Sequence, residues 1–393
     1  MTYNFDDIRC YYDADVPAKL WPLADRPEIA EFIKGAFPQA DVEQVRSILK
    51  SCTTIHDFQH SVIIYFLHML SKQSCDELRI EGTELIDATQ GHVFVTNHRD
   101  IVLDSAYLNT LMADHGLETA EIAIGNNLFA APWIEDLVRL NKSFVVRRDL
   151  TGRQMLESSM KLSAYIHQEV VEKHLPVWIA QREGRSKDNS DQTQSSVIKM
   201  LAMGGQSRDL MQNIRSLNVH PVAISYEFDP CDYLKAAEFQ LKRDNPEWKK
   251  TKADDVKSMV TGMRGYKGRV VYTVTPCLNP VFDTFPWIND KTAQTNCVCN
   301  TIDRALHGAM QLYPINYMAY DIRFETNKYA HMYTPEEQAK AADYLNGQLA
   351  KIDIPNRDET FLWQMLLTMY SNPVVNRESL QREQDENAVP MTD

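Results

Sequence analysis

The sequence has few basic residues, no apolar run of membrane-spanning length and no paired cysteine motif. It contains 41 Lys and Arg against 54 Asp and Glu over 393 residues, a formal charge of −13. Since binding to phosphate backbones needs a basic surface, we expect no nucleic-acid partner. No apolar stretch approaches the roughly 20 residues that cross a bilayer. The 7 Cys form no C-x-x-C pair. We therefore expect no disulfide framework, and we expect a location in the reducing cytoplasm.

The most apolar segment covers residues 61–70, SVIIYFLHML, with His60 preceding it. Apolar stretches of roughly 10–14 residues are more often core helices than membrane segments. The segment therefore predicts a buried helix rather than one that lies in a membrane interface.

The order of helical and strand patterns predicts an α/β fold. Helical patterns fill residues 1–76, and apolar strand patterns then alternate with helices up to residue 226. Such alternation favours a layered mixed sheet with helices on both faces. Seven strands are expected: 78–82, 92–96, 120–124, 144–146, 176–180, 219–226 and 268–274. The predicted organisation is an N-terminal helical region (1–76), an α/β domain (77–285), a C-terminal helical region (286–376) and a flexible tail (377–393).

A histidine follows one predicted strand directly. His98 stands two residues after the strand 92–96, and Asp100 and Asp104 lie just downstream at the start of a predicted helix. Ligands of α/β sheets bind at the carboxyl ends of strands. A carboxylate can orient an imidazole that acts as a general base. Either aspartate fits this description, and the alternative is a surface histidine followed by a helix-capping aspartate.

Basic side chains follow two other predicted strands. Arg147 and Arg148 end the strand 144–146, and a Gly-containing turn after the strand 176–180 carries Arg182, Arg185 and Lys187. Arginine is suited to bidentate contacts with phosphate. In an acidic chain this grouping predicts an anion site, although an isolated arginine more often forms a surface salt bridge.

Four sequence blocks resemble those of the glycerophospholipid acyltransferases. The blocks are Asn97-His98 with Asp104, Phe144-Val-Val-Arg-Arg148, Glu183-Gly184-Arg185-Ser186 and Pro221-Val-Ala-Ile-Ser-Tyr-Glu227. They stand in the order of that family and cover about residues 78–230. Two spacings depart from it. Five residues rather than four separate His98 from Asp104, and no residue lies between Gly184 and Arg185.

The resemblance implies an O-acyltransferase of phospholipid synthesis. His98 would remove a proton from the acceptor hydroxyl, with Asp104 orienting its ring. The substrate-binding residues would be Arg147, Arg148, Glu183, Gly184, Arg185, Ser186 and Lys187. The donor would be an acyl-CoA or acyl-carrier-protein thioester, and the acceptor glycerol-3-phosphate or its 1-acyl derivative. No cofactor or metal is expected. The enzyme would contact the inner face of the membrane peripherally, or work on soluble substrates.

Two alternatives to catalysis by acyl transfer stay open at this point. His98, Asp100 and Asp104 could be the metal ligands of a hydrolase, and the altered spacings could mark a non-catalytic lipid-binding relative. Elsewhere in the chain, His56 and His60 have the spacing of a pair of metal ligands, but the sequence shows no third ligand. The helix 129–140 carries an apolar stripe that includes Trp133; we expect core packing from it, with part of an acyl pocket as the alternative.

Overall fold

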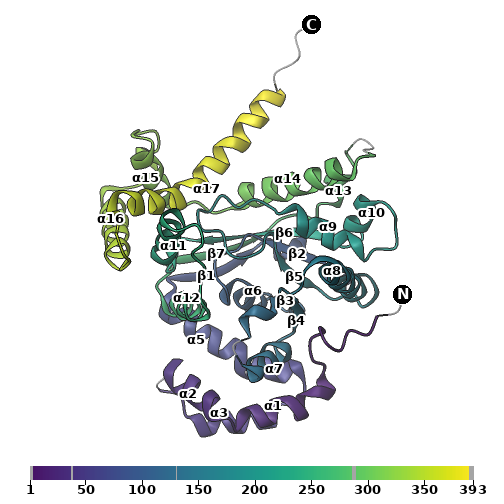
Figure 1. The fold of residues 1–393 in the computed structure, drawn as a ribbon. Helices are drawn as coiled ribbons and strands as arrows, with labels where there is room; N and C mark the ends of the chain where they lie inside the picture. Colours follow the sequence, from purple (N-terminus) through teal and green to yellow (C-terminus); the bar gives the residue numbers. More distant parts are fainter. Residues whose placement is uncertain (1–2, 37–38, 130, 286–288, 389–393) are drawn as a thin grey trace.

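The computed structural model describes residues 3–36, 39–129, 131–285 and 289–388, and its centre is one seven-stranded sheet (Figure 1). The strands are β1 (Glu77–Glu81), β2 (Val93–Thr96), β3 (Glu121–Gly125), β4 (Ser143–Val146), β5 (Val177–Ala180), β6 (Val219–Tyr226) and β7 (Arg269–Val274). Every predicted strand is present within one residue of its expected bounds.

The sheet is mixed, with the order β1-β7-β6-β2-β5-β3-β4. Strands β6, β2, β5, β3 and β4 run parallel, whereas β7 is antiparallel to β6 and parallel to β1. Val93 of β2 is paired with Val177 on one side and Val219 on the other. β2 is thus the central strand, and whatever follows it lies at the middle of the carboxyl edge.

Successive side chains along the strands pack alternately into two separate cores, one on each face of the sheet. Val93 and Val95 point to one face and Phe94 to the other, as the two-residue period of a strand requires. The first face is covered by α8 (Gly152–His167), α9 (Ser195–Met203), α10 (Leu210–Arg215) and α14 (Lys291–Ala309), and the second mainly by α5 (Ile64–Ser74) and α6 (Leu103–Asp114). The predicted α/β fold with helices on both faces is confirmed.

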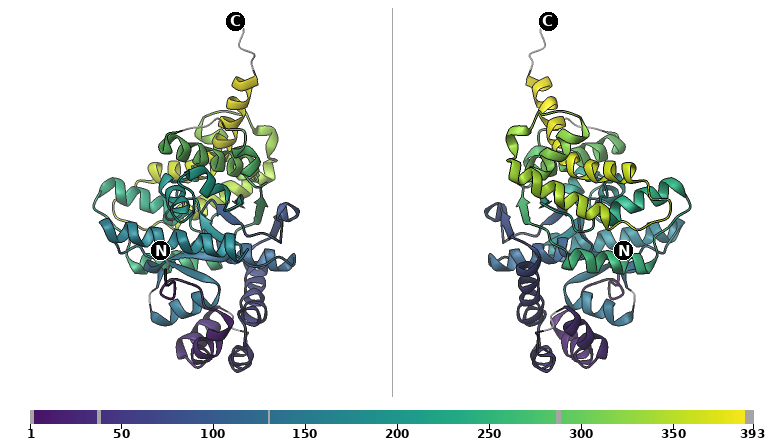
Figure 2. Two further views of the ribbon diagram at one scale, coloured as in Figure 1. Left: turned by 90° about the vertical axis from the view of Figure 1, so that its right-hand side faces the viewer. Right: turned by 90° about the vertical axis from the view of Figure 1, so that its left-hand side faces the viewer.

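The N-terminal helices lie at one end of the molecule, away from the C-terminal helices (Figures 1 and 2). They are α1 (Val16–Ala24), α2 (Pro27–Ala36), α3 (Val42–Ser51) and α4 (Ile55–Phe58), and a π-helix (Gln59–Ile63) joins α4 to α5. Their core also takes in α7 (Pro132–Leu140), through Trp133, Leu137 and Leu140. The apolar stripe of this helix therefore packs against other helices, as expected. The segment 61–70 is helical but only half-buried, since Tyr65 is 58% exposed.

The chain before α1 runs along the outer edge of the sheet. The Val145 amide of β4 donates a hydrogen bond to the Ile8 carbonyl, and the Phe5 ring packs edge-on against Tyr165 of α8. Arg139 of α7 donates to the backbone carbonyls of Asp6 and Arg9. Residues 5–9, here called the N-terminal arm, are thus held against the last strand.

The C-terminal helices form a further core beside β6 and β7. The helices that share this core are α11 (Asp232–Asp244), α15 (Pro314–Arg323), α16 (Pro335–Ala350) and α17 (Glu359–Ala388). In contrast, α12 (Lys252–Arg264) packs on the second face of the sheet beside α5, and α13 (Asn279–Phe282) packs on the first face. Packing does not follow the predicted boundary at residue 285, because α11 packs with α15, α16 and α17 whereas α14 packs on the sheet. The predicted tail 377–393 is also helical as far as Ala388, because α17 continues through it; residues 389–393 lie outside the described residues.

Short single turns connect the longer elements. The 3₁₀ turns are Asp13–Asp15, Thr83–Leu85, Asn126–Leu128 and Ala330–Met332, and a second π-helix (Gln168–Glu172) ends α8. All seven cysteines are free thiols. Among the described residues, no helix has the length and apolar character needed to cross a bilayer.

Candidate active site

His98 and Asp104 form a hydrogen-bonded pair at the end of the central strand. His98 Nδ1 lies 2.8 Å from Asp104 Oδ2, which also accepts the Arg99 amide at 2.6 Å. Asp104 is 1% exposed and the His98 side chain is 14% exposed. Because a carboxylate can only accept, the ring proton lies on Nδ1. Nε2 of His98 is then left with a free lone pair and can take a proton from a hydroxyl.

Asp100 has a different role from Asp104. Its Oδ1 accepts the amides of Val102 and Leu103, both at 2.8 Å, and so caps the N-terminus of α6. Its Oδ2 faces α12 so closely that a β-carbon on Gly262 would lie 1.8 Å away. Burial, followed by the charge of Asp104, raises the pKa of Asp100. Of the two aspartates left open by the sequence, Asp104 is the one that contacts His98.

Asn97 and Arg99, on either side of the histidine, hold the backbone of this loop. The Asn97 amide exchanges two hydrogen bonds with the backbone of Ile224, at 2.8 and 2.9 Å, and so extends the pairing of β2 with β6. Arg99 makes a buried bidentate ion pair with Asp191, at 2.8 and 2.5 Å. This ion pair ties the loop after β5, which carries Asp191, to the loop after β2, which carries Arg99. The sequence pattern alone did not reveal it.

The loop after β5 passes directly beside His98. The Ser186 amide donates to the His98 carbonyl at 3.0 Å, and Gly184 turns the chain with a φ of +68°, a conformation that glycine adopts without strain. Glu183 at this turn accepts from Arg148 at 2.5 Å. Three of the predicted blocks are therefore brought together at the carboxyl edge of the sheet.

Arg147 lies apart from this loop. Its guanidinium pairs with Asp7 of the N-terminal arm at 3.2 Å, and Lys161 of α8 pairs with the same carboxylate. The structure therefore divides the predicted phosphate-binding set. Arg147 is neutralised by the N-terminal arm, Arg148 is paired with Glu183, and the cations after β5 surround a cavity.

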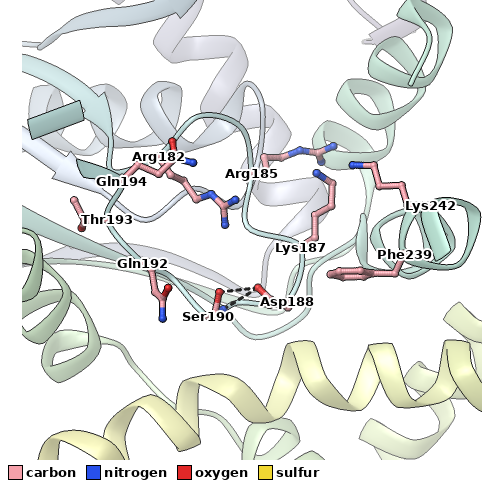
Figure 3. A pocket seen from close by; sticks show the side chains of 10 residues that line it. All are labelled: Arg182, Arg185, Lys187, Asp188, Ser190, Gln192, Thr193, Gln194, Phe239 and Lys242. Carbon is pink, nitrogen blue, oxygen red and sulfur yellow. Dashed lines mark hydrogen bonds between the residues drawn. The ribbon is translucent and has the colours of Figure 1, made fainter. Parts of the chain in front are cut away.

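That cavity has a volume of about 490 Å³ and lies between the loop after β5 and α11 (Figure 3). Its lining residues are Arg182, Arg185, Lys187, Asp188, Ser190, Gln192, Thr193, Gln194, Phe239 and Lys242. Four of these side chains are cationic and one is acidic. Sequence reasoning missed Phe239 and Lys242, because they belong to a charged helical stretch with no recognisable motif.

The cations of this cavity are only partly neutralised. Arg185 is 7% exposed, and neither its Nη1 nor Arg182 Nε has a hydrogen-bond partner among the described residues. Lys187 and Lys242 share one carboxylate, Glu238, at 3.1 and 2.7 Å. Burial lowers the pKa of Lys187. A buried cation without a full set of acceptors is costly, so the cavity is suited to an anionic ligand.

The histidines and aspartates that could have been metal ligands are arranged for other roles. Within the described ranges, no group of three or more His, Cys, Asp or Glu side chains is placed to hold a metal ion. Asp100 faces the start of α6 rather than His98. His56 and His60 stack on each other with ring centroids 4.0 Å apart. The metal-dependent hydrolase therefore finds no support.

A comparison with known families decides the assignment. Residues 77–225 match the family model described as Acyltransferase. These residues form an acyltransferase domain. The match confirms the predicted resemblance to acyltransferases and the class of enzyme, an acyltransferase. The acyltransferase domain begins at β1 and ends in β6, so it contains His98, Asp104 and the loop after β5 but not α11.

Two further comparisons add little to the acyltransferase assignment. No curated protein sequence matches the chain. Among solved structures, the 1-acyl-sn-glycerophosphate acyltransferase PlsC from Thermotoga maritima is similar at 10% identity, over 73% of this chain and 95% of that one. The TM-score is 0.36, and at that value the superposition carries no weight; the assignment rests on the family model.

Proposed function

We propose that the enzyme transfers an acyl group from a thioester donor to the hydroxyl of a phosphate-bearing glycerol acceptor, with His98 as the general base. The observation that carries this proposal is the buried Asp104 carboxylate on Nδ1 of a partly exposed imidazole, 2.8 Å away. Nε2 removes the hydroxyl proton, and Asp104 stabilises the imidazolium that forms.

The reaction needs no covalent intermediate on the protein. The acceptor oxygen attacks the thioester carbonyl, the carbon–sulfur bond breaks, and the imidazolium returns its proton to the leaving thiolate. Backbone amides would stabilise the oxyanion. The donor is an acyl-CoA or an acyl-carrier-protein thioester. No other cofactor takes part in this scheme.

The acceptor's phosphate would bind to the cations after β5, chiefly Arg185 and Lys187. Arg148 stands next to them, since the backbone amide of its partner Glu183 donates a hydrogen bond to the cavity-lining Gln194. Glycerol-3-phosphate and its 1-acyl derivative both meet these requirements. With the lipid acceptor, the enzyme would work in peripheral contact with the inner face of the membrane; with the soluble one, it would work in the cytoplasm.

The test is thiol release from acyl-CoA and from acyl-carrier protein by the full chain, with and without each acceptor. We expect His98→Ala, folded as judged by circular dichroism, to lower kcat by about 10²–10⁴-fold, the usual contribution of general base catalysis. The matched control is His68→Ala, because His68 also pairs with an aspartate, Asp114, at 3.0 Å but on the surface.

Two results would contradict the proposal. Normal turnover by His98→Ala would exclude His98 as the base. An absence of acceptor-dependent thiol release by the unaltered chain, with every donor and acceptor, would instead favour the non-catalytic lipid-binding alternative.

A further inference from the structure

Helix α11 supplies one wall of the cationic cavity although it lies outside the acyltransferase domain. Phe239 and Lys242 of α11 face the loop 182–194 across the cavity (Figure 3). The match to the family model ends at residue 225. The part of the site on α11 is therefore a feature of this chain beyond the shared sequence blocks.

Three cationic side chains converge at the α11 end of the cavity. The ends of Arg185, Lys187 and Lys242 point toward one another in Figure 3. Glu238 contacts the two lysines, and its pKa stays low despite its burial because both of them bind it. Together with Arg182, the three cationic side chains carry four positive charges, against two negative charges on Asp188 and Glu238. The cavity therefore has a surplus of two positive charges.

The carboxylates behind Arg185 do not cancel this surplus. Asp229 is paired with the buried Lys235 at 2.5 Å, and that ammonium holds its pKa low although the group is buried. Asp100 caps α6 and has a raised pKa. Arg185 is more than nine-tenths buried, and its Nη1 has no partner in the described part of the chain. An unpartnered guanidinium N–H is costly. Nη1 itself is enclosed by the protein, so the cavity offers a ligand its surplus of positive charge rather than this N–H.

We propose that this end of the cavity binds a phosphate monoester dianion and that Lys242 is a specificity-determining residue for it. Two negative charges match the surplus, whereas a phosphodiester carries only one. This inference rests on the proposed function, because acyl transfer is the reaction that would bring a phosphate-bearing substrate to the cavity. The bound group is either the acceptor's phosphate or the 3′-phosphate of an acyl-CoA donor.

The rest of the lining fits a polar ligand of this class. Ser190, Gln192, Thr193 and Gln194 offer hydroxyl and amide groups, and Phe239 is the one aromatic side chain among the described lining residues. A fatty acyl chain has no aliphatic wall among these residues, so the cavity holds the polar, phosphorylated part of a substrate and not its chain.

The position of Lys242 is fixed from the C-terminal helices. Lys235 of α11 donates to the carbonyl of Arg99, next to the catalytic histidine, at 3.2 Å. Asp232 at the start of α11 accepts the Tyr370 hydroxyl of α17 at 2.8 Å. The C-terminal helices thus hold α11 in register with the loop that carries His98, which gives them a role in substrate selection.

The experiment compares Lys242→Gln with Lys252→Gln in the full chain. The Lys242 side chain is 52% exposed, so its replacement is compatible with folding, and Lys252 is an exposed lysine in the next helix. Calorimetry measures the Kd for inorganic phosphate. We expect Lys242→Gln to raise this Kd by about 10- to 100-fold, the effect of losing one charge-assisted hydrogen bond, and Lys252→Gln to leave it unchanged.

Kinetics then identify the source of the phosphate. If the acceptor supplies it, Lys242→Gln raises the acceptor KM by a similar factor and leaves the donor KM unchanged. If the donor supplies it, the variant loses the preference for acyl-CoA over its 3′-dephospho form. An unchanged phosphate Kd in Lys242→Gln, or no phosphate binding by the unaltered chain, overturns the proposal. His98→Ala should keep its phosphate affinity, so a failure of acyl transfer is distinguishable from a failure of this site.

Discussion

Replacing Asp104 by Asn removes a charge from beside His98 while keeping the size of the side chain. Asp104 Oδ2 accepts both from His98 and from the Arg99 amide, whereas Oδ1 is buried with no partner among the described residues. In the variant Asp104→Asn, the new side-chain amide would therefore place its oxygen at the shared position and its NH₂ at the unpartnered one. The ring proton stays on Nδ1, so the variant tests charge rather than tautomer.

The magnitude follows from the geometry of the pair. Two unit charges about 4 Å apart interact by about 4 kcal/mol at an effective dielectric constant of about 20. The retained hydrogen bond leaves part of this stabilisation, so we expect a loss of about 2–4 kcal/mol from the transition state. That corresponds to a decrease in kcat of about 30- to 1,000-fold. The buried NH₂ without an acceptor also costs about 1–3 kcal/mol of folding stability.

Acceptor-dependent thiol release at saturating substrate is the assay, and Asp100→Asn is the matched control. Asparagine caps a helix nearly as well as aspartate, so Asp100→Asn should change kcat by no more than a few-fold. The reasoning is refuted if Asp104→Asn, folded as judged by circular dichroism, keeps more than a tenth of the kcat. It is also refuted if the control loses as much activity as Asp104→Asn does.

Two further predictions concern stability. Arg99→Ala leaves Asp191 buried and unpaired, which should lower the free energy of unfolding by about 3–5 kcal/mol; urea denaturation measures this, and a loss below about 1 kcal/mol would contradict it. Burial and the charge of Asp229 raise the pKa of Asp232 to about 7, well above its value in the unfolded chain. The protonated carboxyl is favoured in the folded state, so its stabilisation is present below about pH 4 and is lost as the pH rises to 7. Asp232→Asn should flatten the pH dependence of the urea midpoint in that window, and an unaltered slope would argue against this assignment.

The sequence predicted the sheet well because its strands are buried. Val219–Tyr226, for instance, is buried at every position and is mostly apolar in sequence, with His220 and Ser225 as polar exceptions, a composition that favours a buried strand over a surface helix. His98 and the loop after β5 could be placed at one edge for a related reason, since parallel strands end on the same side. The local pattern of residues was sufficient for these features.

The remaining parts of the site depend on contacts between distant segments. Arg99 pairs with Asp191 because the loop after β5 folds back toward β2, and the local sequence pattern does not predict the course of that loop. Arg147 was expected beside Arg148, but the two point to different partners because the N-terminal arm supplies Asp7. Lys242 reaches the cavity only because α11 packs on the C-terminal helices. In each case the deciding partner lies far away in the chain.

The N-terminal arm also affects how the protein behaves in solution. β4 is the last strand of the sheet, and an uncovered edge strand offers free backbone groups to another molecule's strand. The Ile8 carbonyl accepts a hydrogen bond from the Val145 amide of this strand, and Asp7 forms ion pairs with Arg147 and Lys161 beside it. A truncation that removes the arm would expose this edge to strand-to-strand association, so a loss of activity in such a variant would report self-association rather than a catalytic role of the removed residues.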